Sequence, residues 1–474
     1  MLFSSMVFIF VFLPVVLLVY YLAPRKIRNF LLLLFSIVFY AWGGVSYTAV
    51  LIVSILFNYL FARQLSRDRS PKKLWLSIGL IFNISLLFVF KYLDFFIDNI
   101  NEVGLVFIPD FVGLDEANIV LPLGISFFTF QQMSLIWDVY RNPGVQKLRF
   151  INTALYISLF PQLIAGPIVR YNDIIDQIKG RVETLNLINS GIKRFILGLF
   201  KKIVFANSCG AIADSIMDSH VDDISTPVAW LGVISYAFQI YFDFSGYSDM
   251  AIGLGRMFGF RILENFNFPY ISRSIKEFWR RWHISLSSWF RDYVYIPLGG
   301  NRLGSHRTYF NLLIVFLLTG FWHGATWSFV FWGIFHGTFL IIERLGFDKI
   351  LNRLPKVISW GYMMLVVLIG WVFFRIENFN DAINFVGRLF GFGEDNEALT
   401  VHFLDRERII ILALAALASS TFFLKLKILG TRWLKGETSL YYKLVSGTII
   451  TIMLLYSVLL INSGSYNPFI YFRF

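Results

Sequence analysis

The sequence has little cysteine and little charge, and both shortages narrow the class of protein. One of the 474 residues is a cysteine, Cys209, which excludes an intramolecular disulfide, a thiolate zinc ribbon and a CxxC redox motif. Charged residues make up 15% of the chain and hydrophobic residues 57%, whereas a soluble domain has about 25% charged and about 45–50% apolar residues. The composition therefore excludes intrinsic disorder and argues against a soluble globule.

Long apolar runs separated by short polar segments indicate a polytopic membrane protein. A bilayer crossing needs about 20 apolar residues, and the run from Leu2 to Ala23 meets this length. Residues 29–62 carry no charge and contain Gly43 and Gly44 near their middle, which predicts a helical hairpin. We expect an all-α fold with roughly 10–12 membrane helices, formed by a single domain that spans residues 1–474.

The distribution of charge predicts which segments face the cytoplasm. The net charge is +12, but the basic residues cluster between apolar runs, which is typical of cytoplasmic loops and not of a protein that binds nucleic acid. Segment 256–307 has nine basic and three acidic residues and is predicted to be cytoplasmic. Residues 92–140 contain no Lys or Arg and are predicted to lie outside. The tail, 462–474, is predicted to lie outside or to fold back from there. We expect lipids as partners and no nucleic acid.

Two segments in the second half of the chain predict unusual helices. Residues 308–342 carry no charge and are too long for one crossing and too short for two, so we predict two half-length helices that meet inside the bilayer. Ser274 and Glu277 form a capping-box pattern. Aromatic and apolar residues then recur at helical spacing as far as Tyr293, which predicts one amphipathic helix at the cytoplasmic interface.

His323 is the strongest candidate for a catalytic residue. It stands between Gly320 and Gly324 in the uncharged segment, and a polar residue at membrane depth commonly marks a functional site. Its near-neutral pKa would let it accept and return a proton. The two glycines permit either close helix contact or a break in the helix. The alternative is a histidine that only links two helices.

His336 repeats the pattern between Gly333 and Gly337. On a continuous helix it would lie about 20 Å from His323, so the two rings could not act on one atom unless the helix breaks between them. We assign His336 a structural role.

Other polar residues are candidates for supporting roles. Arg280, Arg281 and Arg291, with Trp282 beside them, would hold the phosphates of a soluble donor; snorkelling to lipid headgroups explains them equally well. Asp243 and Asp249, near the end of an apolar run, need partners and could orient a histidine or arginine or bind ions. The sequence has no GxSxG, HExxH or P-loop motif, so it offers no local hydrolase, zincin or nucleotide-hydrolysis signature, and we expect no metal.

Four segments resemble the membrane-bound O-acyltransferase family. Residues 278–301, FWRRWHISLSSWFRDYVYIPLGGN, resemble its signature, and residues 318–327, LTGFWHGATW, resemble the motif with its invariant histidine. Residues 239–250, QIYFDFSGYSDM, and 165–168, AGPI, are also similar. The closest branch is the bacterial alginate and peptidoglycan O-acetyltransferase type, and the teichoic-acid D-alanyl transfer proteins are shorter cousins.

The resemblance implies a fold and a reaction. The family fold is a ring of helices around a thin centre, with funnels from both faces, in the bacterial cytoplasmic membrane. His323 would lie at the waist as the general base, and His283 near it would orient the donor or stabilise an oxyanion. The donor would be a cytoplasmic thioester, acetyl-CoA in this branch, with no tightly bound cofactor. The acyl group would reach a cell-surface or secreted polysaccharide through an extracytoplasmic esterase-like partner.

The C-terminus adds a candidate acyl acceptor. Residues 469–474, FIYFRF, have the form FxYxxF and resemble the C-terminal motif of a small partner peptide in the D-alanylation system. Tyr471 would then take the acyl group from the thioester and pass it outward. The alternative is an aromatic anchor at the membrane interface.

Other functions fit the same hydropathy. D-alanyl transfer to teichoic acids would use the same residues, and a secondary transporter or flippase would also place polar groups inside the membrane. A non-enzymatic scaffold for polymer assembly is a third possibility. Cleavage of a thioester that depends on His323 would separate the enzyme from the other two.

Overall fold

The computed structural model describes residues 1–108, 112–142, 148–393, 405–434, 436, 439–464, 466–468 and 470. Within this part of the chain the regular structure is entirely helical, which confirms the all-α prediction. The N-terminal helices are η1 (Phe8–Phe12), α1 (Leu13–Leu22), η2 (Arg25–Ile27), α2 (Arg28–Ala41), α3 (Val45–Leu65), α4 (Lys72–Leu87), η3 (Phe88–Tyr92), α5 (Leu93–Phe107), α6 (Ile125–Arg141), α7 (Phe150–Ser158), α8 (Phe160–Leu163) and α9 (Tyr171–Gly180).

The remaining helices complete the fold. The central ones are α10 (Leu185–Phe200), η4 (Lys201–Ala206), α11 (Asn207–Met217), η5 (Val221–Asp223), α12 (Thr226–Met257), η6 (Pro269–Ile271), α13 (Ile275–Arg281), α14 (Ile284–Phe290) and η7 (Arg291–Tyr295). The C-terminal ones are α15 (Ser305–His323), α16 (Trp327–Ile342), η8 (Glu343–Phe347), α17 (Asp348–Arg353), α18 (Lys356–Arg375), α19 (Phe379–Leu389), α20 (Arg406–Ala418), α21 (Phe422–Trp433) and α22 (Leu440–Asn462).

Several helices are long and apolar enough to cross a membrane, as expected of a polytopic protein. By length and composition the described residues contain six such helices, or up to seven if the bent pair α20 and α21, which meet at 72°, is one span. This number is smaller than the roughly 10–12 membrane helices that we expected. Some of the apolar runs that we counted form helices that are shorter than a full crossing, such as η1 and α1 at Phe8–Leu22. The predicted hairpin is confirmed, because α2 and α3 are separated by the turn that contains Gly43 and Gly44.

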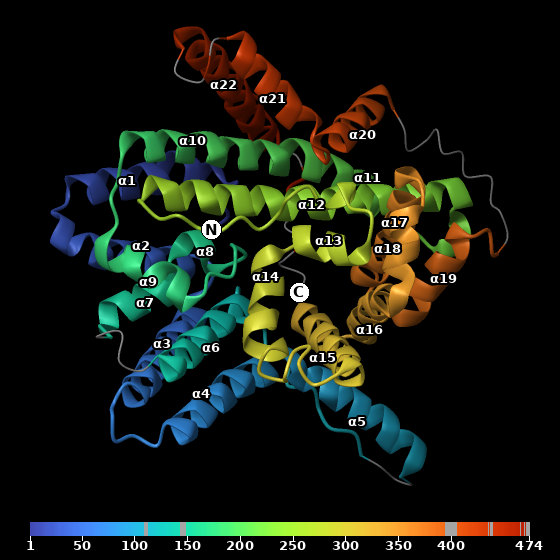
Figure 1. Cartoon of the computed structure of the whole chain (residues 1–474), viewed down its shortest axis with the longest axis horizontal. Coiled ribbons are helices and arrows are strands. Elements are labelled where there is room, and N and C mark those ends of the chain that lie inside the picture. Colours follow the sequence, from blue (N-terminus) through green and yellow to red (C-terminus); the bar gives the residue numbers. More distant parts are fainter. Residues whose placement is uncertain are drawn as a thin grey trace.

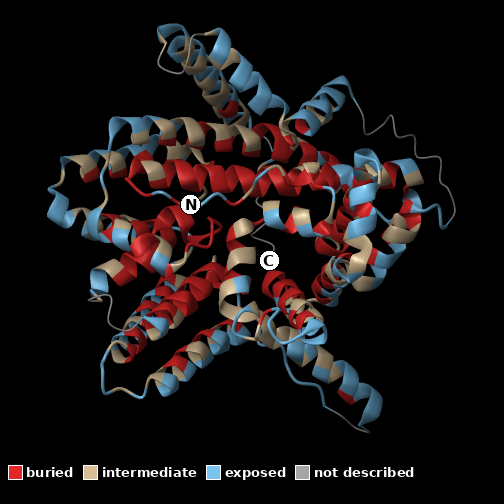
Figure 2. Cartoon of the chain, viewed as in Figure 1, coloured by how far each residue is buried: buried red, intermediate tan, exposed pale blue. Residues whose placement is uncertain are grey.

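The helices are arranged around a centre that α13, α14 and α15 flank (Figure 1). The long helix α12 runs beside α10 along one side, while α20–α22 and α5 project from the body (Figure 1). Buried residues follow α12 and the helices around the centre, and the projecting helices are largely exposed (Figure 2). The apolar side chains of the body form one hydrophobic core. That residues 1–474 form a single domain stays a prediction.

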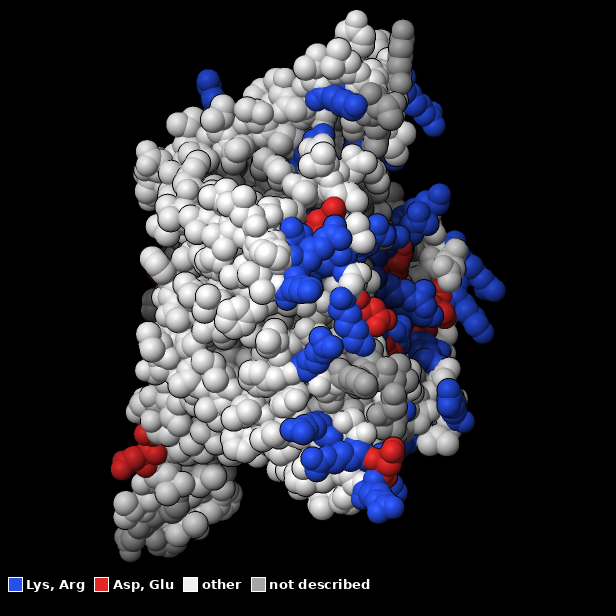
Figure 3. Space-filling view, turned by 90° about the vertical axis from the view of Figure 1, so that its left-hand side faces the viewer, with Lys and Arg blue, Asp and Glu red and all other residues white. Residues whose placement is uncertain are grey.

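Charge is unevenly distributed over the surface. Most Lys and Arg side chains gather toward one edge of the molecule in Figure 3, and the opposite edge is almost free of them. Such an asymmetry is what the positive-inside rule produces. It supports the assignment of the basic segments, including 256–307, to one side of the membrane.

The structure divides the uncharged segment 308–342 into two helices, as predicted, but the predicted half length is wrong, because α15 has 19 residues and the helical stretch Trp327–Arg353 is long enough to cross a membrane. α15 ends at His323, and α16 begins at Trp327. The prediction of one amphipathic helix from Ser274 to Tyr293 is wrong. The capping box is present, since the Ser274 hydroxyl accepts a hydrogen bond from the Glu277 amide at 3.0 Å, but the helix breaks after Arg281, where His283 adopts a left-handed conformation with φ 43°.

Candidate active site

His323 occupies the C-terminal end of α15 and is buried, with 3% of its surface exposed. The helix stops there because Gly324 is extended, with φ −164° and ψ 156°. The Gly324 amide donates to the Gly320 carbonyl at 3.2 Å. That amide is therefore already used, and it is not available as the oxyanion donor that a helix break at Gly324 would otherwise offer.

The glycines around His323 and His336 allow α15 and α16 to touch along their backbones. A Cβ atom at Gly320 would lie 2.3 Å from the Phe329 carbonyl oxygen, and one at Gly333 would lie 2.4 Å from the Phe316 carbonyl oxygen. The two GhhHG patterns are thus complementary surfaces of one helix pair. Close contact and a helix break, the two alternatives suggested by the sequence, both occur.

His283 is held between α13 and α14 by one buried asparagine, Asn265. The Oδ1 atom of Asn265 lies 3.2 Å from Nδ1 of His283 and also accepts from the amide and hydroxyl of Ser285 at 3.1 and 2.8 Å. The Nδ2 atom of Asn265 donates to the Ser248 hydroxyl at 3.1 Å, which fixes the orientation of the amide. Because Oδ1 is an acceptor, His283 carries its proton on Nδ1.

The Nε2 atom of His283 is consequently a hydrogen-bond acceptor. It is buried, and no described residue makes a hydrogen bond to it. A left-handed conformation at a non-glycine residue costs free energy and is typical of functional sites. The arrangement therefore leaves a buried imidazole nitrogen that can accept a hydrogen bond.

The structure brings the two predicted histidines together around one indole. The Trp322 ring centroid lies 5.9 Å from that of His283 and 4.9 Å from that of His323. Phe244 packs on His283 at 4.6 Å, and Phe374 packs on His323 at 4.9 Å. The pair thus lies in a buried aromatic enclosure, and electrostatic interactions are stronger in a buried site than in water.

His336 also lies near this enclosure, because the chain reverses between α15 and α16. The Trp332 ring is 5.1 Å from that of His323 and 5.0 Å from that of His336. Both ring nitrogens of His336 are buried without a hydrogen-bond partner among the described residues. The ring packs edge-on against Trp279 at 5.3 Å, which is consistent with the structural role that we assigned to it.

Lys91 is a residue of this site that the sequence analysis missed. It lies in η3, and its ammonium group donates to the carbonyls of Trp322 and His323 at 2.7 and 3.0 Å and lies 3.4 Å from the Ser126 hydroxyl. A cation at the C-terminus of a helix is stabilised by the helix dipole and caps carbonyls that lack a partner. The signal in the sequence was a single lysine at the end of the apolar run 74–93.

A cavity of 240 Å³ adjoins the end of α15. Its lining includes Lys91 and Asp94 from one side and Gly324, Thr326 and Glu377 from the other. Gly324 follows His323 directly, so the cavity reaches the edge of the histidine pair. That funnels enter the protein from both faces stays a prediction.

Of the four residues predicted to bind the donor, two arginines are paired with acidic residues, one arginine is exposed, and the tryptophan is buried. Arg281 bonds Glu277 at 2.9 Å, Arg291 bonds Asp292 at 2.7 Å, and Arg280 is exposed. Trp282 is buried in an aromatic cluster, 4.9 Å from the Trp371 ring. A donor-binding role for the three arginines and Trp282 stays a prediction.

The two predicted aspartates are both buried, and each has basic partners. Asp249 accepts from Arg194 and Lys201 at 2.6 and 2.7 Å. Asp243 pairs with Lys202 at 2.7 Å. They therefore connect α12 to α10 and η4 and make no described hydrogen bond to a histidine. Tyr471 lies outside the described residues.

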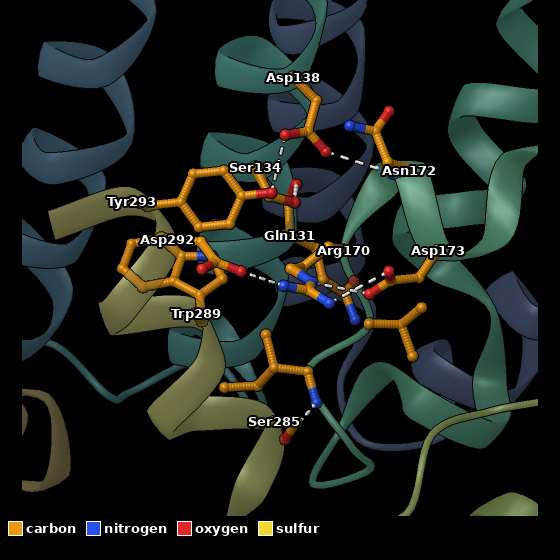
Figure 4. A network of polar contacts seen from close by, with 12 residues as sticks. Gln131, Ser134, Asp138, Arg170, Asn172, Asp173, Ser285, Trp289, Asp292 and Tyr293 are labelled. Carbon is orange, nitrogen blue, oxygen red and sulfur yellow. Dashed lines mark hydrogen bonds and ion pairs between the residues drawn. The ribbon is translucent and has the colours of Figure 1, made fainter. Parts of the chain in front are cut away.

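A second polar network, also missed from the sequence, fixes the helix that follows His283 (Figure 4). Arg170 lies between Asp173, at 2.7 Å, and Asp292, with which it forms an ion pair. The Tyr293 hydroxyl points to Asp138 and donates to it at 2.8 Å. The network links α14 and η7 to α6 and α9 and so restrains His283 from its C-terminal side.

The structure thus has helices long enough to cross a membrane and a buried histidine pair, which are the features of a multi-pass membrane protein with a buried candidate site. The sequence model of the membrane-bound O-acyltransferase family matches residues 141–350. The whole chain is 40% identical to the whole probable alginate O-acetylase of Pseudomonas putida. The chain belongs to the membrane-bound O-acyltransferase family and is an O-acyltransferase.

Two further relatives show how the likeness extends. The peptidoglycan O-acetyltransferase of Helicobacter pylori is 38% identical over 100% of this chain and 98% of its own. The teichoic acid D-alanyltransferase of Streptococcus thermophilus is 37% identical over 47% of this chain and 56% of its own. The relatives matched over their full length are therefore O-acetyltransferases.

Proposed function

We propose that the protein takes an acetyl group from acetyl-CoA on the cytoplasmic side of a bacterial cytoplasmic membrane and delivers it for O-acetylation of a cell-surface or secreted polysaccharide. The observation that carries the proposal is the buried pair His283 and His323 around Trp322, at the end of a helix that adjoins a cavity. The full-length relatives named as O-acetyltransferases favour acetyl as the acyl group.

The chemistry is acyl transfer between sulfur and oxygen. A nitrogen of His323 takes the proton of an acceptor hydroxyl while the oxygen attacks the thioester carbonyl carbon. The carbon–sulfur bond then breaks, and the thiolate leaves and recovers the proton from the imidazolium. Positioned acid–base catalysis of this kind contributes typically about 10²–10⁴-fold, and no covalent intermediate on either histidine is needed.

His283 supports the reaction through its Nε2 atom. Since Nδ1 faces the Asn265 oxygen, Nε2 accepts a hydrogen bond and would orient a donating group of the substrate. Stabilising an oxyanion instead would require Nε2 to be protonated. Orientation of the donor is therefore the role that this tautomer favours.

Tyr471 is the proposed first acceptor of the acyl group. Its phenol oxygen would form an ester with the acyl carbon after losing its proton to His323, and an extracytoplasmic esterase-like partner would carry the group to the polysaccharide. The experiment is to compare wild type with Tyr471→Phe in cells. Acetyl groups on the surface polysaccharide should fall to background in the variant, and unchanged acetylation would remove Tyr471 from the pathway.

Mass spectrometry of surface and secreted glycans tests the main proposal. Cells with wild-type protein should show glycans heavier by acetyl groups, and cells with His323→Gln should not. His306→Gln is the matched control, because His306 is exposed at the opposite end of the same helix. Glycans that gain D-alanyl groups instead would support the teichoic-acid alternative, and unchanged glycans with His323→Gln would contradict the proposal.

A transporter or flippase is the second candidate, since the cavity and the half-buried Lys91 also fit a passage for a polar substrate. Purified protein distinguishes the two. An enzyme releases free CoA from acetyl-CoA in the presence of acceptor, whereas a transporter moves its substrate with the thioester intact.

A further inference from the structure

The C-terminal segment after α22 returns to the body and is fixed there at four points. The Tyr466 hydroxyl donates to Asp214 of α11, and Asn207 Nδ2 donates to the Asn467 side chain at 3.3 Å. The Pro468 carbonyl accepts from the Lys202 ammonium, and the Ile470 amide donates to Asp243 Oδ2 at 2.9 Å. We call residues 466–468 and 470, with these contacts, the tail strap.

The inner end of the tail strap is held by a buried ion pair. The Asp243 and Lys202 side chains are 2% and 3% exposed and lie 2.7 Å apart. A buried ion pair loses much hydration and needs further hydrogen bonds to offset that cost. Here the further hydrogen bonds go to the backbone of the strap, because Lys202 bonds Pro468 and Asp243 bonds Ile470.

The second aspartate of the same helix provides the contrast. Asp249, six residues later on α12, is also buried, but its partners are Arg194 and Lys201. The hydrogen bonds that Asp249 accepts come from α10 and η4. The two acids of the segment 239–250 thus differ in what they hold, one a helix pair and the other the end of the chain.

The tail strap lies next to the histidine site. Phe244 follows Asp243 and packs on the His283 ring at 4.6 Å. Glu377 lines both the 240 Å³ cavity beside Gly324 and a small cavity of 20 Å³ under the strap, which Tyr466, Pro468 and Ile470 also line. The strap therefore runs from the surface of α11 to the wall shared with the site.

The geometry points to Asp243 and Lys202 as the anchor that docks the tail strap beside the histidine site and thereby sets the rate of acyl delivery. This inference rests on the proposed function, in which the C-terminal segment receives the acyl group. Asp243 and Lys202 are positioning residues: they act on the reaction through the strap. Without the anchor, the donor still binds, but its acyl group is delivered more slowly.

Cysteine labelling tests the anchor without reference to catalysis. Ile470→Cys places a thiol at a position that is 6% exposed, and the only other cysteine of the sequence, Cys209, is 0% exposed. A maleimide should react slowly with this protein and at least about tenfold faster when Asp243→Asn is added, because a hydrogen bond to a charged group is lost. Asp249→Asn is the matched control and should leave the rate unchanged.

A second variant covers the case in which Asp243→Asn does not fold. Ile470→Pro removes the amide that donates to Asp243 and leaves the side chains of Asp243 and Lys202 in place. It should lower the kcat of acyl delivery at least about tenfold with the KM for acetyl-CoA unchanged; Asn467→Ala, which removes an outer contact of the strap, should have a smaller effect. A lower kcat in Lys202→Met that Lys202→Arg largely restores would support the same role.

The outcomes separate the anchor from the proposed function. Equal labelling of the Ile470→Cys protein with and without Asp243→Asn, or full delivery by Ile470→Pro, would overturn the anchor. Faster labelling of Asp243→Asn together with intact delivery by Tyr471→Phe would uphold the anchor and overturn the tyrosine as acyl carrier.

Discussion

The helices around the histidine pair and the three C-terminal helices of the same chain are packed very differently. α12, α15 and α16 meet their neighbours through glycines and aromatic rings, and 25 of the 32 residues of α12 are buried. In α22 one residue, Ser457, is buried, and α21 has no buried residue. Catalysis needs groups held to within a fraction of an ångström, whereas a helix that faces lipid needs only length and apolar character.

The largest loss of activity should follow from replacing the reacting residue among the helices around the histidine pair. His323→Gln should lower the rate of thioester cleavage by about 10²–10⁴-fold, because the general base is lost. Free CoA released by purified protein measures this rate. His306→Gln should behave as wild type, and a similar loss in both variants would show that the effect is not specific to the site.

The close helix contact gives the next largest difference, now in stability. Gly333→Ala places a Cβ 2.4 Å from the Phe316 carbonyl oxygen, and overpacking of this kind costs about 1–3 kcal/mol. Gly447→Ala in α22 meets no atom within 4 Å and should be neutral or stabilise by up to about 1 kcal/mol. Unfolding midpoints in detergent compare the two, and equal midpoints would mean that the helices are not in contact.

Lys91→Met tests whether the end of α15 needs its cation. The loss of a cation at a helix C-terminus costs up to about 2 kcal/mol, so kcat should fall by about tenfold or more while KM stays the same. Lys73→Met, on the exposed surface of α4, is the control. A higher KM with unchanged kcat would instead make Lys91 a ligand-binding residue.

A smaller effect, on the free energy of unfolding and dependent on pH, is expected at Glu183, away from the histidine pair. Glu183 accepts from the Tyr20 hydroxyl at 2.6 Å and pairs with Arg28 at 3.1 Å. Burial by itself raises the pKa of Glu183, but the Tyr20 hydrogen bond and the Arg28 charge outweigh it, and the pKa is lowered. The stabilisation is therefore full above the unfolded pKa of about 4.3 and is lost as the pH falls through the folded pKa.

Glu183→Gln tests this sign. Wild type should be more stable than the variant by on the order of 1 kcal/mol above pH ~6, and the difference should vanish in acid. Thermal unfolding at several pH values measures it. A difference that grows as the pH falls would contradict the lowered pKa.

The sequence predicted the helical class, the hairpin at Gly43 and Gly44, and the break after His323, because apolar length and glycine act locally. It did not predict the break at His283, since the aromatic stripe from Phe278 to Tyr293 has helical spacing throughout. The break depends on Asn265, which is 18 residues away and supplies the hydrogen bonds that offset the strained conformation.

The contributions of Lys91 and of the Arg170 network were hidden for the same reason. Lys91 meets His323 across 232 positions of sequence, and Arg170 meets Asp292 across 122. Spacing along the chain carries no information on such contacts. His323 was predicted because a polar residue in an uncharged segment is conspicuous without any partner. The role of His283 was predicted from the resemblance of residues 278–301 to a family signature.

The most direct measurement uses protein in sealed vesicles with labelled acetyl-CoA on the cytoplasmic side only and the polysaccharide acceptor on the other. The account predicts that label appears on the outer acceptor while free CoA stays on the donor side, and that His323→Gln abolishes both products. Intact acetyl-CoA on the acceptor side, or transfer of label by the His323→Gln protein, would contradict it.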